Sequence, residues 1–191
     1  MYAGSGMYYC PVIVWPSALA IARATASGLS PFHREAGACQ LDGRGNGGSS
    51  TDASHIAAEF INRFKRERPG LPAIALNTDM AVITSIANDY DFSEIFAKQL
   101  KALADEGDVV IAISTSGNSP NIMKAMDVAK KRKLTTIAFT GLKGEKFASR
   151  ATFAFVVPSD NTPRIQETHI TIGHVICQIV EDILFDIPRK K

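Results

Sequence analysis

An uninterrupted apolar run at residues 109–113, followed six residues later by a helix signal, constrains the fold more than any other feature. A continuous Val-Val-Ile-Ala-Ile stretch is typical of a strand that is buried on both faces, as in a parallel sheet. Pro120 suits the first position of a helix, and Ser119 before it is a predicted N-cap. Strand, short loop and helix together predict an α/β fold.

The same alternation recurs along the chain from about residue 50. Hydrophobic periodicity predicts helices at residues 51–66, 79–87, 93–104, 120–132 and 162–185. Short apolar runs predict strands at residues 73–76, 109–113, 135–139 and 153–157. The last helix is expected to pack on the sheet through Ile165, Ile172, Val175, Ile176, Ile179 and Ile183. Strands that alternate with helices predict right-handed βαβ units and a parallel sheet.

The first 44 residues do not follow this pattern. They contain many glycines and prolines, and only residues 17–27 are long enough for a short helix. Residues 35–42 are too polar to supply a strand before the glycines that follow. The sequence therefore predicts an atypical N-terminal segment, residues 1–44, and one main domain, residues 45–191.

Composition narrows the class of protein. A chain of 191 residues suits one domain, and a net charge of +2 with no basic face gives no reason to expect nucleic-acid binding. The three cysteines share no metal or disulfide spacing, which favours a reducing compartment. The apolar stretch at residues 11–22 is interrupted by prolines and is too short to span a membrane. We therefore expect a cytoplasmic protein.

The loop after the central apolar run could hold a phosphate. It offers four hydroxyl groups without any lysine or arginine, on Ser114, Thr115, Ser116 and Ser119. A helix N-terminus directly after such a loop favours anions, because its first N–H groups have no partner within the helix. The alternative is an ordinary Ser/Thr-rich turn with a capped helix, and we favour the phosphate site.

A second glycine-rich loop lies before the helix expected at residues 51–66. Gly43, Gly45 and Gly48 have the spacing of the dinucleotide fingerprint, but the required hydrophobic strand is missing. A Walker A loop is excluded because no Gly-Lys-Ser/Thr follows. The loop is better interpreted as a turn where the backbone approaches a sugar or a phosphate.

Several polar side chains could carry chemistry. His55 and Glu59 are four residues apart, so they share one side of a helix and suit a metal pair, an acid/base pair or a plain exposed pair. On the last helix the spacing does not choose between His169 and His174 as a partner of Gln166. Other polar groups have both structural and ligand-binding interpretations: the pair Asn88-Asp89, and the cations Arg63 and Arg164.

Residues 45–186 resemble the phosphoheptose isomerases of the sugar-isomerase (SIS) fold. The resemblance is carried, in the family's order, by GNGGSSTDASHIAAE, PAIALNTD, SIANDY, ISTSGNSPN, TGLKG, VVPSDNT and RIQETHITIGH. It implies a three-layer αβα sandwich with a roughly five-stranded, mainly parallel sheet, assembled as a homotetramer with sites at subunit interfaces. It also implies interconversion of sedoheptulose 7-phosphate and D-glycero-D-manno-heptose 7-phosphate through an enediol(ate).

The resemblance also implies roles for individual residues. The phosphate would bind to the four hydroxyl residues Ser114, Thr115, Ser116 and Ser119. The sugar site would be lined by Asn46, Gly47, Gly48, Ser49, Glu59, Asn88, Asp89 and Gln166. One zinc ion per subunit would be held by His55, Glu59, Gln166 and His174, which selects His174 over His169. Glu59 and His174 would also form the acid/base pair.

A second resemblance is to the DnaA-initiator-associating protein, a non-catalytic tetramer of the same fold. The segment INRFKRERPGLPAIALNTD and the SIANDY motif are similar to that protein. The isomerase is favoured because this chain keeps Glu59, Gly48 and Ser116. A SIS-domain protein that binds the replication initiator DnaA remains the alternative.

Overall fold

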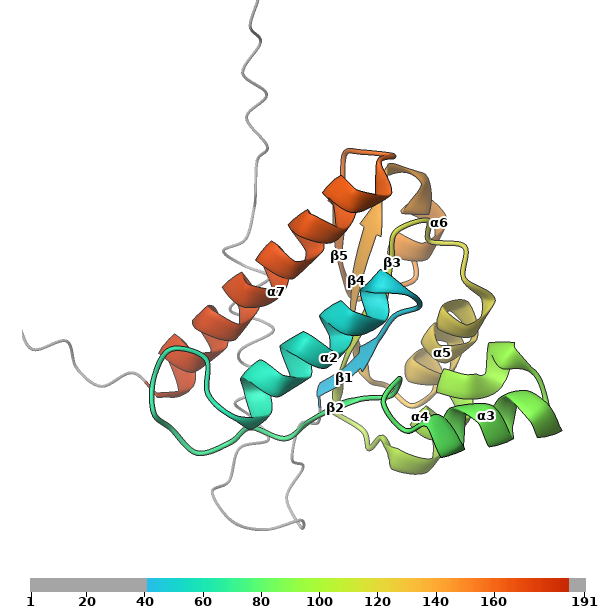
Figure 1. The fold of residues 1–191 in the computed structure, drawn as a ribbon, viewed down its shortest axis with the longest axis horizontal. Helices are drawn as coiled ribbons and strands as arrows, with labels where there is room; N and C mark the ends of the chain where they lie inside the picture. The colour runs from blue at the N-terminus through green and yellow to red at the C-terminus, as the bar shows by residue number, and fades with distance from the viewer. Residues whose placement is uncertain (1–40, 186–191) are drawn as a thin grey trace, which may run out of the picture.

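A computed structural model describes residues 41–185, with the backbone alone for residues 41–44. Its five strands form one parallel sheet in the order β2-β1-β3-β4-β5 (Figure 1). The strands are β1 Leu41–Arg44, β2 Ala73–Ala75, β3 Val109–Ser114, β4 Thr135–Gly141 and β5 Phe153–Val157. The predicted parallel α/β sheet is confirmed.

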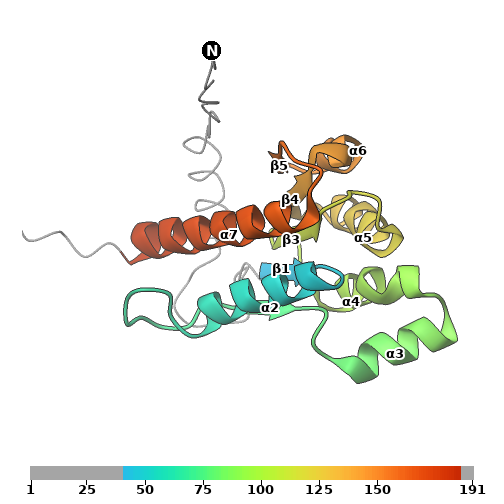
Figure 2. The same cartoon turned by 45° about the horizontal axis from the view of Figure 1, so that its top comes forward.

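Helices cover both faces of the sheet, which makes three layers. Along β3, Val110 and Ala112 join one hydrophobic cluster, and Val109, Ile111 and Ile113 join the other, because successive strand residues point to opposite faces. The first cluster lies under α4 Ile95–Leu103, α5 Pro120–Lys131 and α6 Glu145–Ala148. The second lies under α2 Gly48–Ile61 and α7 Thr162–Leu184, which run side by side in both views (Figures 1 and 2).

Helix α3, Met80–Asp89, is the peripheral part of the fold. It stands at one end of the molecule, beyond α4 (Figure 2). None of its residues is buried, although it carries several apolar side chains. Short 3-10 helices at Phe92–Glu94 and Leu142–Gly144 complete the described elements. Among the described residues, no helix is long and apolar enough to cross a membrane.

The expectation that no strand precedes the glycine loop is wrong, because Leu41–Arg44 form β1. This strand pairs with β2 on one side and with β3 on the other. It is only four residues long and includes Asp42 and Arg44, so it has too little apolar sequence to show a strand pattern. It forms a strand because the two neighbouring strands supply hydrogen-bond partners for its backbone N–H and C=O groups. The short helix expected at residues 17–27 lies outside the described residues.

Two helix predictions also need correction. Helix α2 begins at Gly48 and ends at Ile61, so Phe64 belongs to the loop that follows rather than to the helix. On α7, Val175 and Ile183 are exposed, although they belong to the predicted buried stripe. The buried side of α7 is formed by Ile165, His169, Gly173, Ile176, Cys177 and Val180. This helix carries two apolar stripes, and periodicity alone does not decide which one faces the sheet.

The strand order places a topological switch beside β1. The chain passes from β1 to β2 on one side, and then crosses to β3 on the other side of β1. The loops that follow β1 and β3 therefore lead to helices on opposite faces and separate at the carboxyl edge of the sheet. In parallel α/β sheets this crevice is where ligands bind.

Candidate functional site

The two loops at the switch point are joined by a pair of amide side chains. Asn46 in the glycine loop donates to the side-chain oxygen of Asn121 at 3.0 Å, and Asn121 donates back to that of Asn46 at 2.8 Å. Asn121 lies in the first turn of α5 and is buried. This reciprocal pair connects the glycine loop to the first turn of α5, directly after the hydroxyl loop. The two sides of the crevice are therefore linked by hydrogen bonds.

The hydroxyl loop is folded around its own side chains. The Oγ atoms of Ser114 and Ser119 lie 3.2 Å apart, and the backbone N–H of Gly117 donates to Ser114 Oγ at 3.1 Å. Ser119 occupies the N-cap position of α5, as predicted, but its side chain makes no capping bond. Pro120 has no N–H, and the N–H of Ile122 donates to the side-chain oxygen of Asn121 at 2.9 Å, so an anion here would depend mainly on the loop hydroxyls and the helix dipole.

Gly117 allows this loop to approach the neighbouring 3-10 helix. Its φ is +66°, a conformation that side chains with a Cβ rarely adopt. A Cβ at this position would lie 2.5 Å from the Cα of Gly144. The tight approach packs the loop onto the end of β4, where Gly141 N–H donates to the carbonyl of Thr115 at 3.0 Å.

Three potential metal ligands meet between α2 and α7. Nε2 of His55 lies 3.1 Å from a carboxylate oxygen of Glu59 and 3.4 Å from Nε2 of His174. One ligand atom from each of the three side chains lies within 4.8 Å of the others. His55 and Glu59 are one turn apart on α2, and α7 supplies His174 from the neighbouring helix. His55 is exposed, whereas Glu59 and His174 are half-buried, so the cluster is open to solvent.

The donor set fits a zinc ion. Two imidazole nitrogens and one carboxylate oxygen are the three protein ligands found in one common type of catalytic zinc site. Such a site leaves a coordination position for water or substrate. The residues present are therefore chemically suited to the metal that the resemblance implies.

Gln166 and His169 lie elsewhere on α7. The Gln166 amide touches Gly48 at the start of α2, and the eight residues between Gln166 and His174 correspond to about 12 Å of helix rise. His169 is fully buried beside Phe139, with ring centroids 5.6 Å apart. Both ring nitrogens are buried, and the Thr140 backbone lies beside the ring. Burial lowers the pKa of His169, against a smaller opposing effect from the Thr140 backbone, so the ring is neutral.

The remaining predicted residues lie in different settings. Ser49 is buried at the start of α2. Asn88 donates to Asp89 at 2.9 Å at the exposed end of α3, and no described contact links this pair to the two loops. Arg63 and Arg164 each make an exposed ion pair, with Glu67 and Glu167 respectively.

The sequence analysis missed three residues that the structure places around the site. Asn121 is the buried partner of Asn46, and Phe64 packs against the ring of His174. Asp52 lies one turn before His55 and has a buried carboxylate oxygen without a partner among the described residues. Burial raises the pKa of Asp52, although His55 nearby opposes the shift. The clearest signal in the sequence was a polar residue, Asn121, inside an apolar helix turn.

Comparisons with known proteins agree on one family. The SIS-domain profile matches residues 40–141. The phosphoheptose isomerase of Thermodesulfovibrio yellowstonii is 74% identical over 147 residues, which cover 77% of this chain and 73% of that protein. The phosphoheptose isomerase of Nitratidesulfovibrio vulgaris is 53% identical over 142 residues, or 74% of this chain and 68% of that protein.

Two solved structures are similar over most of both chains. Phosphoheptose isomerase GmhA from Neisseria gonorrhoeae has a TM-score of 0.76 and 37% identity, and the match covers 89% of this chain and 88% of that one. A phosphoheptose isomerase from Francisella tularensis also has a TM-score of 0.76, with 42% identity and coverage of 87% and 86%.

Proposed function

The chain belongs to the phosphoheptose isomerase family of SIS-domain proteins, and we propose that it interconverts sedoheptulose 7-phosphate and D-glycero-D-manno-heptose 7-phosphate. The observation that carries this proposal is the cluster of three side chains that the structure brings together, His55, Glu59 and His174. The first two lie on α2, the helix that begins at the glycine loop, and the third lies on α7. The comparisons bring no support for the alternative of a replication-initiator-binding protein.

The substrate phosphate is assigned to the hydroxyl loop. Ser114 and Ser119 already lie within hydrogen-bonding distance of each other, so both hydroxyls can turn toward one anion without rearrangement. The N-terminus of α5 behind the loop adds a favourable helix dipole. Thr115 and Ser116 supply the other hydroxyls. Asn46, Gly47, Gly48, Ser49 and Gln166, which lie around the start of α2, are assigned to the sugar hydroxyls.

An aldose–ketose shift moves one proton between two adjacent carbons and another between their oxygens. Glu59 is assigned as the base that takes the carbon-bound proton, and His174 as the group that exchanges a proton with the oxygen. Both side chains reach the same space from different helices, since each lies near His55. A substrate bound in that space could therefore meet both groups without movement of either helix.

A metal site is assigned to His55, Glu59 and His174. Gln166, the fourth ligand that the resemblance implies, lies about 12 Å further along α7 and is not part of this cluster. When bound there, zinc would supply Lewis-acid stabilisation of negative charge on the substrate oxygens. Binding requires neutral imidazoles and an ionised carboxylate, so metal affinity is expected to fall in acid.

The wider assembly is proposed on the resemblance and on one feature of the surface. Helix α3 has no buried residue, and Met80, Tyr90 and Phe92 on and beside it are more than half exposed. Such apolar exposure is typical of an interface. We propose a cytoplasmic homotetramer in which Asn88 and Asp89, distant from the described site contacts, line a site of another subunit.

Glu59→Gln tests the assignment, because it keeps the size of the side chain and removes its basicity. Turnover of sedoheptulose 7-phosphate with zinc present should fall by at least about a hundredfold, the usual contribution of a positioned base. Calorimetric binding of a sugar phosphate should be retained. Glu67→Gln, a 92% exposed glutamate after α2, is the matched control and should leave turnover unchanged. Full turnover by Glu59→Gln would remove Glu59 from the chemistry, and an inactive parent protein would overturn the proposed activity.

A further inference from the structure

The loop at residues 62–70, which connects α2 to β2, brings an aromatic ring onto a metal-site histidine. The rings of Phe64 and His174 lie 5.6 Å apart and are tilted by 32°. His174 also meets the ring of His55, at a centroid distance of 4.9 Å and an angle of 72°, an edge-to-face arrangement. The His174 imidazole therefore contacts two rings at distances typical of favourable aromatic contacts.

The orientation of His174 depends on this packing to an unusual degree. Metal-binding histidines usually donate their second ring N–H to a carboxylate or a carbonyl, which fixes the ring. The part of the chain that the structure describes contains no such partner for Nδ1 of His174, whose one hydrogen-bond contact is between Nε2 and His55. Instead, the ring of Phe64 packs against the imidazole.

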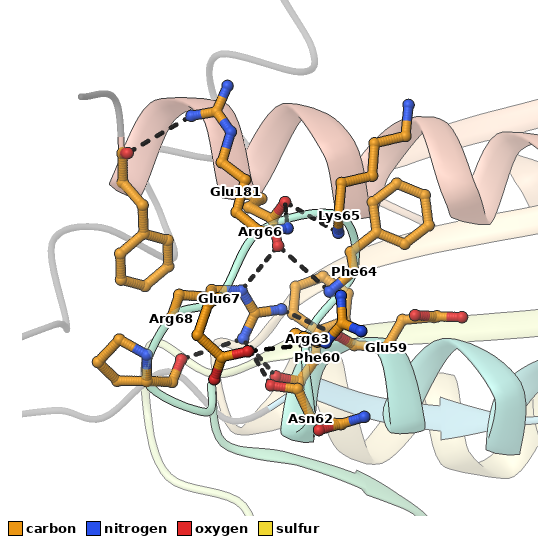
Figure 3. A network of polar contacts seen from close by, with 12 residues as sticks. Glu59, Phe60, Asn62, Arg63, Phe64, Lys65, Arg66, Glu67, Arg68 and Glu181 are labelled. Carbon is orange, nitrogen blue, oxygen red and sulfur yellow. Dashed lines mark hydrogen bonds and ion pairs between the residues drawn. The ribbon is translucent and has the colours of Figure 1, made fainter. Parts of the chain in front are cut away.

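Phe64 itself is fixed by a buried carboxylate on α7. Glu181 accepts hydrogen bonds from three successive backbone N–H groups, those of Phe64, Lys65 and Arg66, at 3.2, 3.1 and 2.9 Å. The side chain of Arg68 adds a fourth bond at 3.0 Å (Figure 3). Glu181 and Arg68 are only 2% and 3% exposed. The loop is thus fastened to the same helix that carries His174, about two turns further along.

The same arginine ties this loop to the other metal-site helix. Arg68 donates to the backbone carbonyls of Glu59 at 2.8 Å and Phe60 at 2.9 Å. These carbonyls lie in the last turn of α2, where no N–H group of the same helix remains to donate to them. One buried ion pair therefore joins the end of α2, the loop and α7, which together carry Glu59, Phe64 and His174.

We propose that Phe64 is a positioning residue for His174, and that the Glu181–Arg68 pair holds it in that place. Phe64 contacts no reacting atom in this scheme. It restricts the rotation of the His174 ring so that Nε2 stays directed toward His55 and Glu59. The inference rests on the proposed metal site, and it adds a residue and a loop that act on that site from outside.

The test compares two substitutions of Phe64 with a matched control at another phenylalanine. Phe64→Leu removes the ring and keeps an apolar side chain, whereas Phe64→Tyr keeps the ring. Phe155→Leu is the control, because Phe155 is also a partly buried phenylalanine against the same core and contacts Phe139 rather than His174. Zinc affinity is measured by competition with a chromogenic chelator. The geometry of the site is read from the visible spectrum of the cobalt-loaded protein.

Phe64→Leu should weaken zinc binding by about 10- to 100-fold, the usual effect of losing a group that orients a ligand. Its cobalt spectrum should change, whereas Phe64→Tyr and Phe155→Leu should keep the parent's affinity and spectrum. Equal zinc affinity in Phe64→Leu and Phe155→Leu would overturn the proposal. A parent protein that binds neither zinc nor cobalt would instead remove the metal site on which it rests, and these two failures are distinguishable.

Discussion

Replacement of Glu181 by glutamine should destabilise the protein more than any other single-atom change in this part of the fold. Glutamine keeps the shape of the side chain but turns one of its two acceptor groups into a donor. That NH₂ group would then face backbone N–H groups that now bond to the carboxylate. The charge of Arg68, only 3% exposed, would also lose its partner.

The expected loss is about 3–5 kcal/mol, the range for removing one partner of a buried ion pair. For a chain of this size, each kcal/mol lowers the melting temperature by about 2–4 °C. The pH dependence has a definite sign. Burial alone would raise the pKa of Glu181, but the hydrogen bonds from Lys65, Arg68, Phe64 and Arg66 outweigh it, so the pKa lies below its usual value.

A lowered folded-state pKa means that the stabilisation is fully present above the unfolded pKa of about 4.3. It is lost as the pH falls through the folded pKa. The difference in melting temperature between parent and Glu181→Gln should therefore be constant near neutral pH and shrink in acid. Asp182→Asn, which breaks the half-exposed pair with Arg66, is the control and should cost less than about 1 kcal/mol.

Thermal unfolding is followed at one protein concentration, since association of subunits would shift the apparent stability. The reasoning is refuted if Glu181→Gln costs no more than Asp182→Asn. It is also refuted if the difference between Glu181→Gln and the parent grows in acid.

Three further outcomes follow from the geometry. Gly117→Ala should lower the free energy of unfolding by at least about 1–2 kcal/mol, because alanine is strained in the left-handed backbone conformation of this position. It should also weaken the binding of a sugar phosphate measured by calorimetry, and unchanged binding would contradict this. Asn121→Ala should lower the free energy of unfolding by about 1–3 kcal/mol, because Asn46 in the glycine loop loses its buried hydrogen-bond partner. It should raise KM more than it lowers kcat, and an unchanged KM would contradict a role of this pair in holding the loop. Burial raises the pKa of Cys177 to about 12, so its thiol is unreactive in the folded protein. In a Cys10→Ser, Cys39→Ser background, a thiol reagent should therefore label Cys177 only after unfolding. Rapid labelling of the native protein would contradict this.

The sequence was informative where a local rule determines the structure. The apolar run of β3, the proline at the start of α5 and the spacing of His55 and Glu59 each predicted a feature that the structure contains. The resemblance then selected His174 over His169, and the structure places His174 with the α2 pair and His169 in the core.

The failures share a different cause, because they depend on contacts between distant parts of the chain. β1 is a strand because of its two neighbours, and its own short sequence contains only one large apolar residue, Leu41. The buried side of α7 was misjudged because two apolar stripes compete, and the sheet selects one of them. Asn121 and Phe64 acquire their places only through partners 75 and more than 100 residues away in sequence, which no local pattern encodes.

The separation of His55 and His174 by 119 residues has a consequence for when the proposed metal site can form. During synthesis, α2 leaves the ribosome long before α7 exists. A single histidine–glutamate pair on one helix is a weak ligand set, so the nascent chain cannot retain a zinc ion. The complete ligand set exists only after α7 has docked beside α2, so zinc bound at the proposed site would be acquired late and would report on completed folding.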